Sequence, residues 1–184
     1  MLNLVLCITL RMYIAKLHAT LQLWDIGGQS IGSKMITNYI SGADAVLLCY
    51  DITNYESFVN LEDWYRLVLK TFKGKPLPYV DLVGNKNDLR HMSAVRPDQH
   101  ARFADENDMS SFLMSAKNGD QVKQVFYKVA GNLVGALPVL ANNLESQVSN
   151  TVVNAVIIDH KRHDDKVNSG SVPEYTKTNN CLIS

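Results

Sequence analysis

This chain of 184 residues has few cysteines, no net charge and few long apolar runs. Its 18 Lys and Arg residues balance 18 Asp and Glu residues, which argues against a general nucleic-acid binder because such proteins carry a basic excess. The three cysteines, Cys7, Cys49 and Cys181, are odd in number and lack the spacing of metal ligands. They indicate a reducing compartment rather than a disulfide framework.

The N-terminal segment, residues 1–19, is apolar only over residues 4–8. Arg11 and Lys16 interrupt it, so it is too short to span a bilayer, and it lacks the positive start of a signal peptide. We predict instead a strand that is buried or lies at a sheet edge. The composition, 46% hydrophobic, suits one globular domain with a real core.

Strand and helix patterns alternate after residue 20. Apolar runs predict strands, several of them buried on both faces, and 3.6-residue periodicity predicts the helices between them. This alternation is typical of an α/β fold with a doubly wound, mostly parallel sheet. The predicted strands are 21–25, 45–50, 79–84 and 111–114, and the predicted helices are 33–40, 56–72, 97–107 and 120–137, with a polar loop over 90–96.

Beyond residue 138 the composition becomes polar, and we predict a mostly disordered tail over 139–180. One apolar island interrupts it at residues 152–158, Val-Val-Asn-Ala-Val-Ile-Ile. The island is either a short strand that docks on a partner or an incidental run. The domain boundaries that follow are an atypical segment 1–19, a domain 20–138 and a tail 139–184.

Three polar stretches follow predicted strands. They are Asp25-Ile26-Gly27-Gly28-Gln29, Gly84-Asn85-Lys86-Asn87-Asp88 and Ser115-Ala116-Lys117. Because ligands of doubly wound sheets bind beyond the carboxyl ends of the strands, the three stretches are expected to converge on one crevice.

The second and third stretches suit a guanine base. The Asp88 carboxylate can accept from the ring N–H and the exocyclic amine in a fork, which selects guanine over adenine. The stem of Lys86 can lie along the nucleotide while Asn85 ties neighbouring loops together. The backbone N–H of Ala116 can donate to the guanine carbonyl, and Lys117 can cover the other face of the base.

These motifs resemble a known family. The sequences WDIGGQ, LLCYDITNYESF, VGNKNDL and MSAK look like the Ras-superfamily small GTPases, and residues 50–58 are particularly similar to the Rab family. The WDIGGQ variant resembles a diverged Rab branch that ends in a single prenylated cysteine. The resemblance covers roughly residues 20–135.

The resemblance implies a GTP/GDP-binding switch in intracellular membrane and vesicle trafficking that hydrolyses GTP. It places Asp25 near Mg²⁺ through water, the Gly28 N–H at the γ-phosphate, and Gln29 as the catalytic residue that orients the attacking water. It assigns Asn85, Lys86 and Asp88 to the guanine, with Ser115, Ala116 and Lys117 closing the pocket. Effectors and regulators of the Rab type are the expected protein partners.

One family motif is missing from the sequence. The phosphate-binding motif Gly-x-x-x-x-Gly-Lys-Ser/Thr does not occur, and the nearest stretch, Gly28-x-x-x-Gly32-Ser33-Lys34, has another spacing and follows another strand. The threonine loop that closes over Mg²⁺ is missing too. In the family's order of elements, the missing piece includes a central strand and the first helix. We therefore expect unpaired strand edges, and we expect Met1–Tyr13 to fill part of the gap.

The missing motif leaves two functions open. The first is the nucleotide-switched trafficking GTPase, and the second is a non-catalytic module that binds partners and carries a lipid anchor. We expect a truncated or alternative gene product whose own GTP hydrolysis is weak or absent, because contacts to a charged phosphate contribute about 1.5–3 kcal/mol each.

The last four residues, Cys181-Leu182-Ile183-Ser184, fit a Cys-aliphatic-aliphatic-X motif that predicts farnesylation of Cys181 by a prenyltransferase. One lipid without a net basic neighbourhood gives reversible membrane attachment. The expected location is therefore cytoplasmic, with reversible association at the cytoplasmic face of a membrane.

Overall fold

A computed structural model describes residues 5–14, 17–27, 34–135 and 151–159 of the chain. Six strands form one sheet in the order β1-β2-β6-β3-β4-β5. The strands β2, β6, β3, β4 and β5 pair in parallel, and β1 pairs with β2 antiparallel at the edge. The sheet confirms the predicted α/β class and mostly parallel pairing. The strands are β1 (Val5–Ile14), β2 (Leu17–Gly27), β3 (Ala45–Asp51), β4 (Tyr79–Asn85), β5 (Ser110–Leu113) and β6 (Thr151–Asp159).

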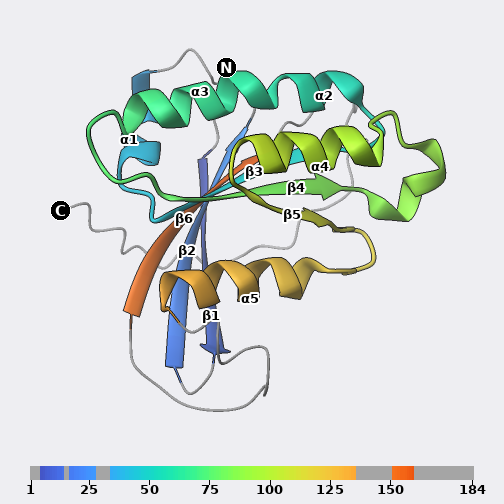
Figure 1. Cartoon of the computed structure of the whole chain (residues 1–184). Helices are drawn as coiled ribbons and strands as arrows, with labels where there is room; N and C mark the ends of the chain where they lie inside the picture. The colour runs from blue at the N-terminus through green and yellow to red at the C-terminus, as the bar shows by residue number, and fades with distance from the viewer. Residues whose placement is uncertain (1–4, 15–16, 28–33, 136–150, 160–184) are drawn as a thin grey trace, which may run out of the picture.

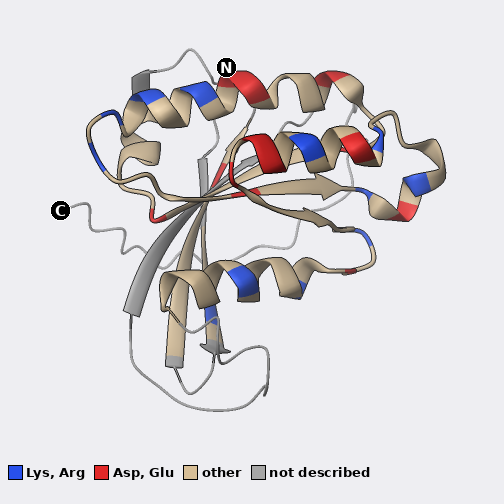
Figure 2. Cartoon of the chain, viewed as in Figure 1, with Lys and Arg blue, Asp and Glu red and all other residues tan. Residues whose placement is uncertain are grey.

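Helices cover both faces of the sheet (Figure 1). The helices α1 to α4 lie on one face and α5 lies on the other, as in a doubly wound fold. Acidic and basic side chains are interspersed along α3 and α4, whereas strands β2 to β5 carry little charge (Figure 2). The helices are α1 (Lys34–Ser41), α2 (Tyr55–Val59), α3 (Leu61–Thr71), α4 (Pro97–Glu106) and α5 (Val122–Leu133), with a 3-10 helix η2 over Asn87–Met92.

The core consists of two hydrophobic clusters, one on each face of the sheet. Trp64 and Val68 of α3 pack with Tyr50 and other residues of the first face, and each of the three is at most 1% exposed. On the second face, Val125 and Val129 of α5 pack under the sheet. Strand β3 supplies both clusters because its neighbouring residues point to opposite faces, which explains its unbroken apolar run.

Strand β6 corrects the interpretation of the apolar island at residues 152–158. Residues 151–159 lie between β2 and β3, with Val156 paired to Trp24 on one side and Val46 on the other. The apolar island is therefore an inner strand rather than a docking segment or an incidental run. An apolar run is typical of an inner parallel strand. The other predicted tail residues lie outside the described part of the chain.

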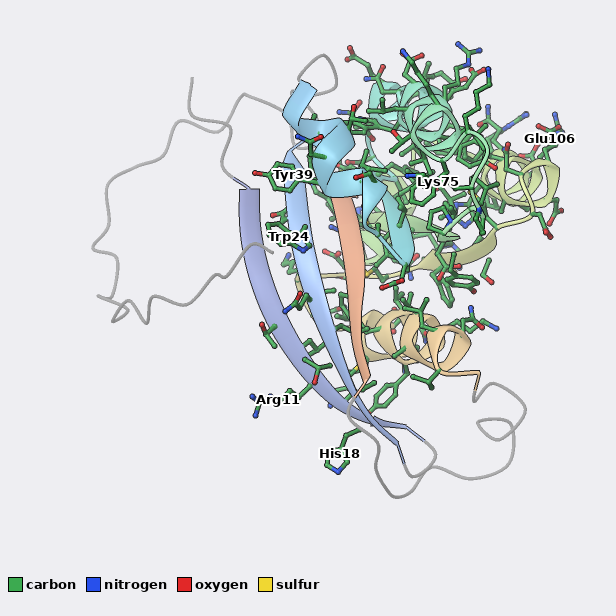
Figure 3. The ribbon with its side chains drawn as sticks, turned by 90° about the vertical axis from the view of Figure 1, so that its left-hand side faces the viewer. Arg11, His18, Trp24, Tyr39, Lys75 and Glu106 are labelled. Atoms are coloured by element: carbon green, nitrogen blue, oxygen red, sulfur yellow. The ribbon has the colours of Figure 1, made fainter. Side chains whose placement is uncertain are left out.

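Strand β6 also corrects the expectation of unpaired edges in the middle of the sheet. The slot between β2 and β3 is occupied by β6, while Val5–Ile14 pairs with the outer side of β2. The N-terminal segment thus forms the predicted strand, at an edge, and does not fill the central gap. On β1, Ile8 is 47% exposed, and the Arg11 side chain is exposed as well (Figure 3).

Smaller differences concern element boundaries. The helix predicted over 56–72 is two helices, separated at Asn60, and η2 occupies part of the predicted loop 90–96. Strand β5 is only partly buried because it lies at the sheet edge. Helix α5 is shorter than predicted, since Gln121 before it and Gly135 after it take left-handed backbone conformations.

Candidate functional site

The loops after β4 and β5 meet at the carboxyl edge of the sheet. Backbone hydrogen bonds join them: Met114 N–H donates to Gly84 O at 2.8 Å, and Asn87 N–H donates to Met114 O at 2.9 Å. Gly84 permits this approach, because a Cβ there would lie 2.7 Å from Leu113 Cδ2 and 3.0 Å from the Tyr50 hydroxyl. The two predicted base-binding stretches are therefore neighbours, as the sequence indicated.

Two side-chain contacts fix the predicted pocket residues in place. The Ser115 hydroxyl donates to Asp88 Oδ1 at 2.6 Å, and the Ala116 N–H donates to Asn85 Oδ1 at 3.0 Å. Ser115 is fully buried, whereas the Asp88 side chain is 15% exposed. The Asp88 carboxylate is thus oriented by a buried hydroxyl and still reaches the surface, which suits a group that accepts hydrogen bonds from a ligand.

The two lysines of the motif lie at the solvent side of the pocket. Lys117 Nζ lies 3.8 Å from Asp88 Oδ2, and its side chain is 81% exposed. Lys86 takes a left-handed backbone conformation, φ 70°, and its side chain is half exposed. This turn sends Lys86 back across the end of the sheet toward β3.

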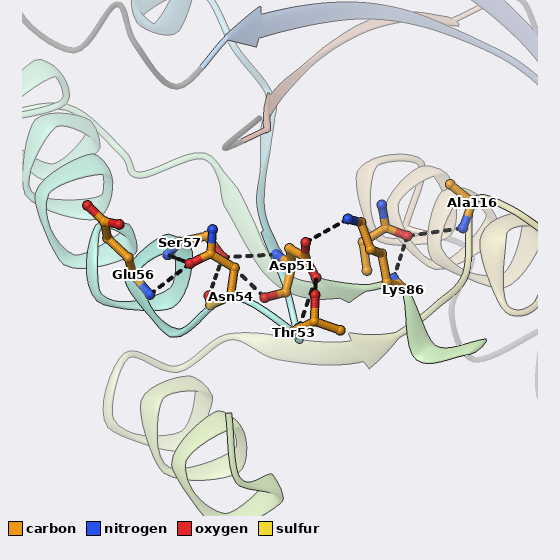
Figure 4. A network of polar contacts seen from close by, with 8 residues as sticks. Asp51, Thr53, Asn54, Glu56, Ser57, Lys86 and Ala116 are labelled. Atoms are coloured by element: carbon orange, nitrogen blue, oxygen red, sulfur yellow. Dashed lines mark hydrogen bonds and ion pairs between the residues drawn. The ribbon is translucent and has the colours of Figure 1, made fainter. Parts of the chain in front are cut away.

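Asp51 is a site residue that the sequence analysis missed. Its carboxylate Oδ2 lies 2.8 Å from Lys86 Nζ, and Oδ1 accepts from both the N–H and the hydroxyl of Thr53 (Figure 4). Burial alone would raise the pKa of Asp51, but the hydrogen bonds from Lys86 and Thr53 outweigh it and lower the pKa below its ordinary value. An Asp at the end of the buried strand 45–50 was the signal available in the sequence.

The loop after Asp51 is fixed by its own polar contacts. The Asn54 side chain caps α2 by accepting from the N–H groups of Glu56 and Ser57 (Figure 4). The buried Ser57 hydroxyl donates to Asn54 O at 2.7 Å and accepts from Asp51 N–H at 3.1 Å. These bonds hold Asp51 rigidly opposite Lys86.

Asp25 does not lie just past the end of its strand, as the sequence analysis expected. Strand β2 continues to Gly27, and the register sets Asp25 level with Leu47 of β3 and with Asp81 of β4. Asn85 lies four residues further along β4. Asp25 is half-buried, and Trp24 beside it packs on Tyr39 of α1 with 5.4 Å between ring centroids (Figure 3). Gly28, Gln29 and Cys181 lie outside the described residues.

The described residues thus combine a mostly parallel α/β sheet with two polar loops, after β4 and β5, that meet at its carboxyl edge. Comparison with known proteins gives the class: a model of the Ras family matches residues 7–134, so the chain belongs to the Ras family of small GTPases.

Within that family, the chain is of the Rab type. It is 34% identical to the Ras-related protein Rab-28 of Caenorhabditis elegans over 92% of this chain and 67% of that protein. It is 35% identical to RabQ of Dictyostelium discoideum over 64% of this chain and 56% of that protein. Rab-3 of C. elegans is 39% identical over 59% of this chain and 49% of that protein. The chain therefore spans from about half to about two thirds of the length of these relatives.

Within the described residues, no helix is both long enough and apolar enough to cross a membrane, and no cluster of three or more His, Cys, Asp or Glu side chains could hold a metal ion.

Proposed function

We propose that this Rab-type chain binds a guanine nucleotide, GDP or GTP, at the carboxyl edge of the sheet. The observation that carries the proposal is the pair of contacts from Ser115 to Asp88 and from Ala116 to Asn85. They assemble the base pocket before any ligand binds, so little ordering entropy is lost on binding.

Each pocket residue has a distinct part in this proposal. The Asp88 carboxylate accepts from the ring N–H and exocyclic amine of guanine. The exposed Ala116 N–H, which donates to Asn85 Oδ1, shares its proton between that oxygen and the guanine carbonyl. The stems of Lys86 and Lys117 cover the two faces of the base. On binding, part of the contact between the Lys86 ammonium and the Asp51 carboxylate is replaced by contact between Lys86 and the nucleotide. The Asp51 carboxylate keeps the ammonium group at the entrance of the pocket.

The phosphate end of the site is proposed from the family alone. There Gln29 would orient the water that attacks the γ-phosphate, the Gly28 N–H would contact that phosphate, and Asp25 would help to hold Mg²⁺ through water. With the nucleotide and Mg²⁺ bound, these three residues would act in GTP hydrolysis.

The cellular part of the proposal follows the Rab-type relatives. The chain acts in vesicle trafficking through effector and regulator proteins that read its nucleotide state. Farnesylation of Cys181 by a prenyltransferase anchors it reversibly to the cytoplasmic face of a membrane. Mass spectrometry of protein from farnesylating cells, with Cys181→Ser as control, tests the anchor.

A second candidate function has one observation in its favour. Strand β6 is one of the two central strands of this sheet, and the residues after it read His160-Lys161-Arg162-His163, without a Gly-x-x-x-x-Gly-Lys motif. This arrangement favours a base pocket without the usual phosphate cradle. The chain would then act as a non-catalytic, prenylated module that binds partners.

A titration of fluorescent GDP with Mg²⁺ tests the nucleotide proposal, using Asp88→Asn as the variant. The amide of this variant loses the charged fork, two contacts of about 1.5 kcal/mol each, so the affinity should fall about 100-fold. Because an amide can donate to the second carbonyl of xanthine, the variant should bind xanthosine diphosphate better than GDP. Asp98→Asn on α4, which also removes one carboxylate, should change neither affinity.

The titration separates the two functions. The nucleotide-switch function is supported if the unaltered chain binds GDP tightly and Asp88→Asn binds xanthosine diphosphate better than GDP. Equal GDP affinity in Asp88→Asn and in the unaltered chain would contradict the assigned pocket. No binding at high micromolar GDP would favour the non-catalytic module.

A further inference from the structure

Residues 69–77 form a basic surface where α3 ends and the connection to β4 begins. Lys70, Lys73 and Lys75 are exposed there, and Leu69 and Leu77 are 39% and 54% exposed. The stretch contains no acidic residue. Among the described residues, none of the three lysines forms an ion pair, so no carboxylate of that part of the chain is in contact with them. We call residues 69–77 the basic tip.

The basic tip is held in a fixed shape by a tight turn. Phe72 is anchored in the core at 7% exposed, and its backbone carbonyl accepts from Lys75 N–H at 2.8 Å. Gly74 takes φ 81° in this turn, a conformation that residues with a side chain rarely adopt. Lys73 and Lys75 are therefore presented from a stiff backbone, and little ordering entropy is lost when they meet a partner.

The basic tip lies at the amino edge of the sheet and projects from it. In Figure 1 the connection between α3 and β4 extends beyond the neighbouring ends of α4 and α5, and Figure 2 shows basic positions along it. Two acidic residues flank its base: Asp44 O accepts from Tyr79 N–H at 3.0 Å, and Asp108 lines a cavity with Leu77. Lysine side chains are longer than those of aspartate, so the ammonium groups meet an approaching surface first.

The composition of the basic tip fits an anionic membrane surface. Anionic headgroups attract lysine side chains, and exposed leucines beside the lysines can enter the boundary between headgroups and acyl chains. We propose that the basic tip is a second membrane contact, which docks on anionic phospholipid headgroups. The residues of the proposed nucleotide pocket lie at the opposite edge of the sheet, so docking leaves them accessible.

The proposed farnesyl anchor needs such a second contact, and in this respect the inference rests on the proposed function. One lipid gives only marginal attachment, which a basic patch can strengthen. Residues 159–177 do not supply this patch, because they hold four basic and four acidic residues.

The chain between β6 and Cys181 is long enough for both contacts to reach one membrane. Cys181 lies 22 residues beyond Asp159, the last residue of β6. Such a stretch spans up to about 70 Å when extended. The nine residues of β6 span only about 30 Å, so the stretch can return from the carboxyl edge to the amino edge.

Vesicle binding by the farnesylated full chain tests the proposal. The anionic vesicles combine phosphatidylserine and phosphatidylcholine at a ratio of about 1:2, and the neutral vesicles are phosphatidylcholine alone. Each lysine near an anionic surface strengthens binding about fivefold, so binding to the anionic vesicles should be about tenfold or more tighter. The triple variant Lys70→Gln/Lys73→Gln/Lys75→Gln should lose this preference and keep its binding to neutral vesicles.

A matched control removes the same charge from other elements. The triple variant Arg90→Gln/Arg102→Gln/Lys123→Gln changes three exposed basic residues of η2, α4 and α5. It should keep the preference for anionic vesicles. An equal loss in the two triple variants would show that net charge rather than the basic tip determines binding, and would overturn the proposal.

A second measurement does not need the farnesyl group. Bicelles of the same anionic mixture that contain a paramagnetic lipid should broaden the amide signals of Leu69, Gly74 and Leu77 in the unmodified full chain. The signals of Asn85 and Ser115, at the opposite edge, should stay sharp. The proposal is overturned if the broadened signals lie elsewhere, or if the variant of the three tip lysines binds anionic vesicles as tightly as the unaltered chain. If Cys181 carries no farnesyl group, binding to neutral vesicles fails as well, and the bicelle measurement decides the proposal alone.

Discussion

The two sides of the sheet are built in different ways. On one side, β3, β4, β5 and the helices between them come from one continuous stretch, residues 45–135, and each strand pairs with one near it in sequence. On the other side, the hairpin β1–β2 reaches β3 only through β6, whose residues 151–159 come from the far end of the chain. The first side depends on local order in the sequence, and the second depends on a distant segment.

This difference matters for the proposed function because the residues of the proposed base pocket belong wholly to the first side. Asn85, Asp88 and Ser115 are positioned by β4, β5 and the turns that follow them. Asp25, by contrast, is positioned by β2, which is joined to the pocket through β6. Base recognition can therefore persist under changes to β6 that alter the geometry around Asp25.

Val156→Pro is the change with the largest expected effect. Strand β6 is paired on both sides, and proline removes a backbone donor from an inner strand, where it is not normally tolerated. We expect the free energy of unfolding to fall by about 3 kcal/mol or more. Denaturant titration measures it.

Thr151→Pro is the matched control, since the first position of a strand accepts proline. If Val156→Pro unfolds within about 0.5 kcal/mol of the unaltered chain, as a surface substitution would, β6 is not an integral strand of the sheet.

The same difference explains what the sequence could predict. Strands 45–50 and 79–84 were found because apolar runs bounded by turn residues identify buried strands locally. The meeting of the loops after strands 79–84 and 111–114 followed from parallel strands that share a carboxyl edge. The place of residues 151–159 could not be predicted, because an apolar run shows that a segment is buried without showing which strands flank it.

Two parts of the site depended on geometry that the sequence does not carry. The left-handed turn at Lys86 brings its ammonium group to Asp51, and no local pattern marks a non-glycine residue for that conformation. The register that holds Asp25 level with Asp81 is set by the pairing of β2 with β6. A polar residue near a strand end could not reveal where the strand actually ends.

Tyr50→Phe probes the local side with an intermediate effect. Burial raises the pKa of the Tyr50 hydroxyl, which stays protonated and bonds His100 Nδ1 at 2.9 Å. Both residues are buried, so removing the hydroxyl leaves a ring nitrogen without this partner and costs about 1–2 kcal/mol. Denaturant titration at neutral pH checks the loss.

The pH dependence gives this prediction a second measurement. Burial lowers the pKa of His100 below 6.5, so below that value the unfolded chain binds more protons than the folded one. Stability should therefore decline as the pH falls from 6.5 toward the folded-state pKa. His100→Gln should remove this part of the decline, and an unchanged acid profile in that variant would show that His100 does not cause it.

Arg66→Ala is expected to have the smallest effect, although Arg66 also belongs to the local side. On α3 its guanidinium contacts Glu62 one turn earlier, and both side chains are at least 60% exposed. Water screens such a pair, so its loss should change the free energy of unfolding by about 0.3–0.5 kcal/mol. A loss above about 1 kcal/mol would contradict this prediction. It would show that exposed ion pairs stabilise this side of the sheet as much as buried hydrogen bonds such as those of Ser115 and Tyr50. Denaturant titrations at low and high salt measure the change in the free energy of unfolding. High salt should abolish a contribution from the ion pair, because salt screens exposed charges. A contribution from packing of the Arg66 stem should persist at high salt.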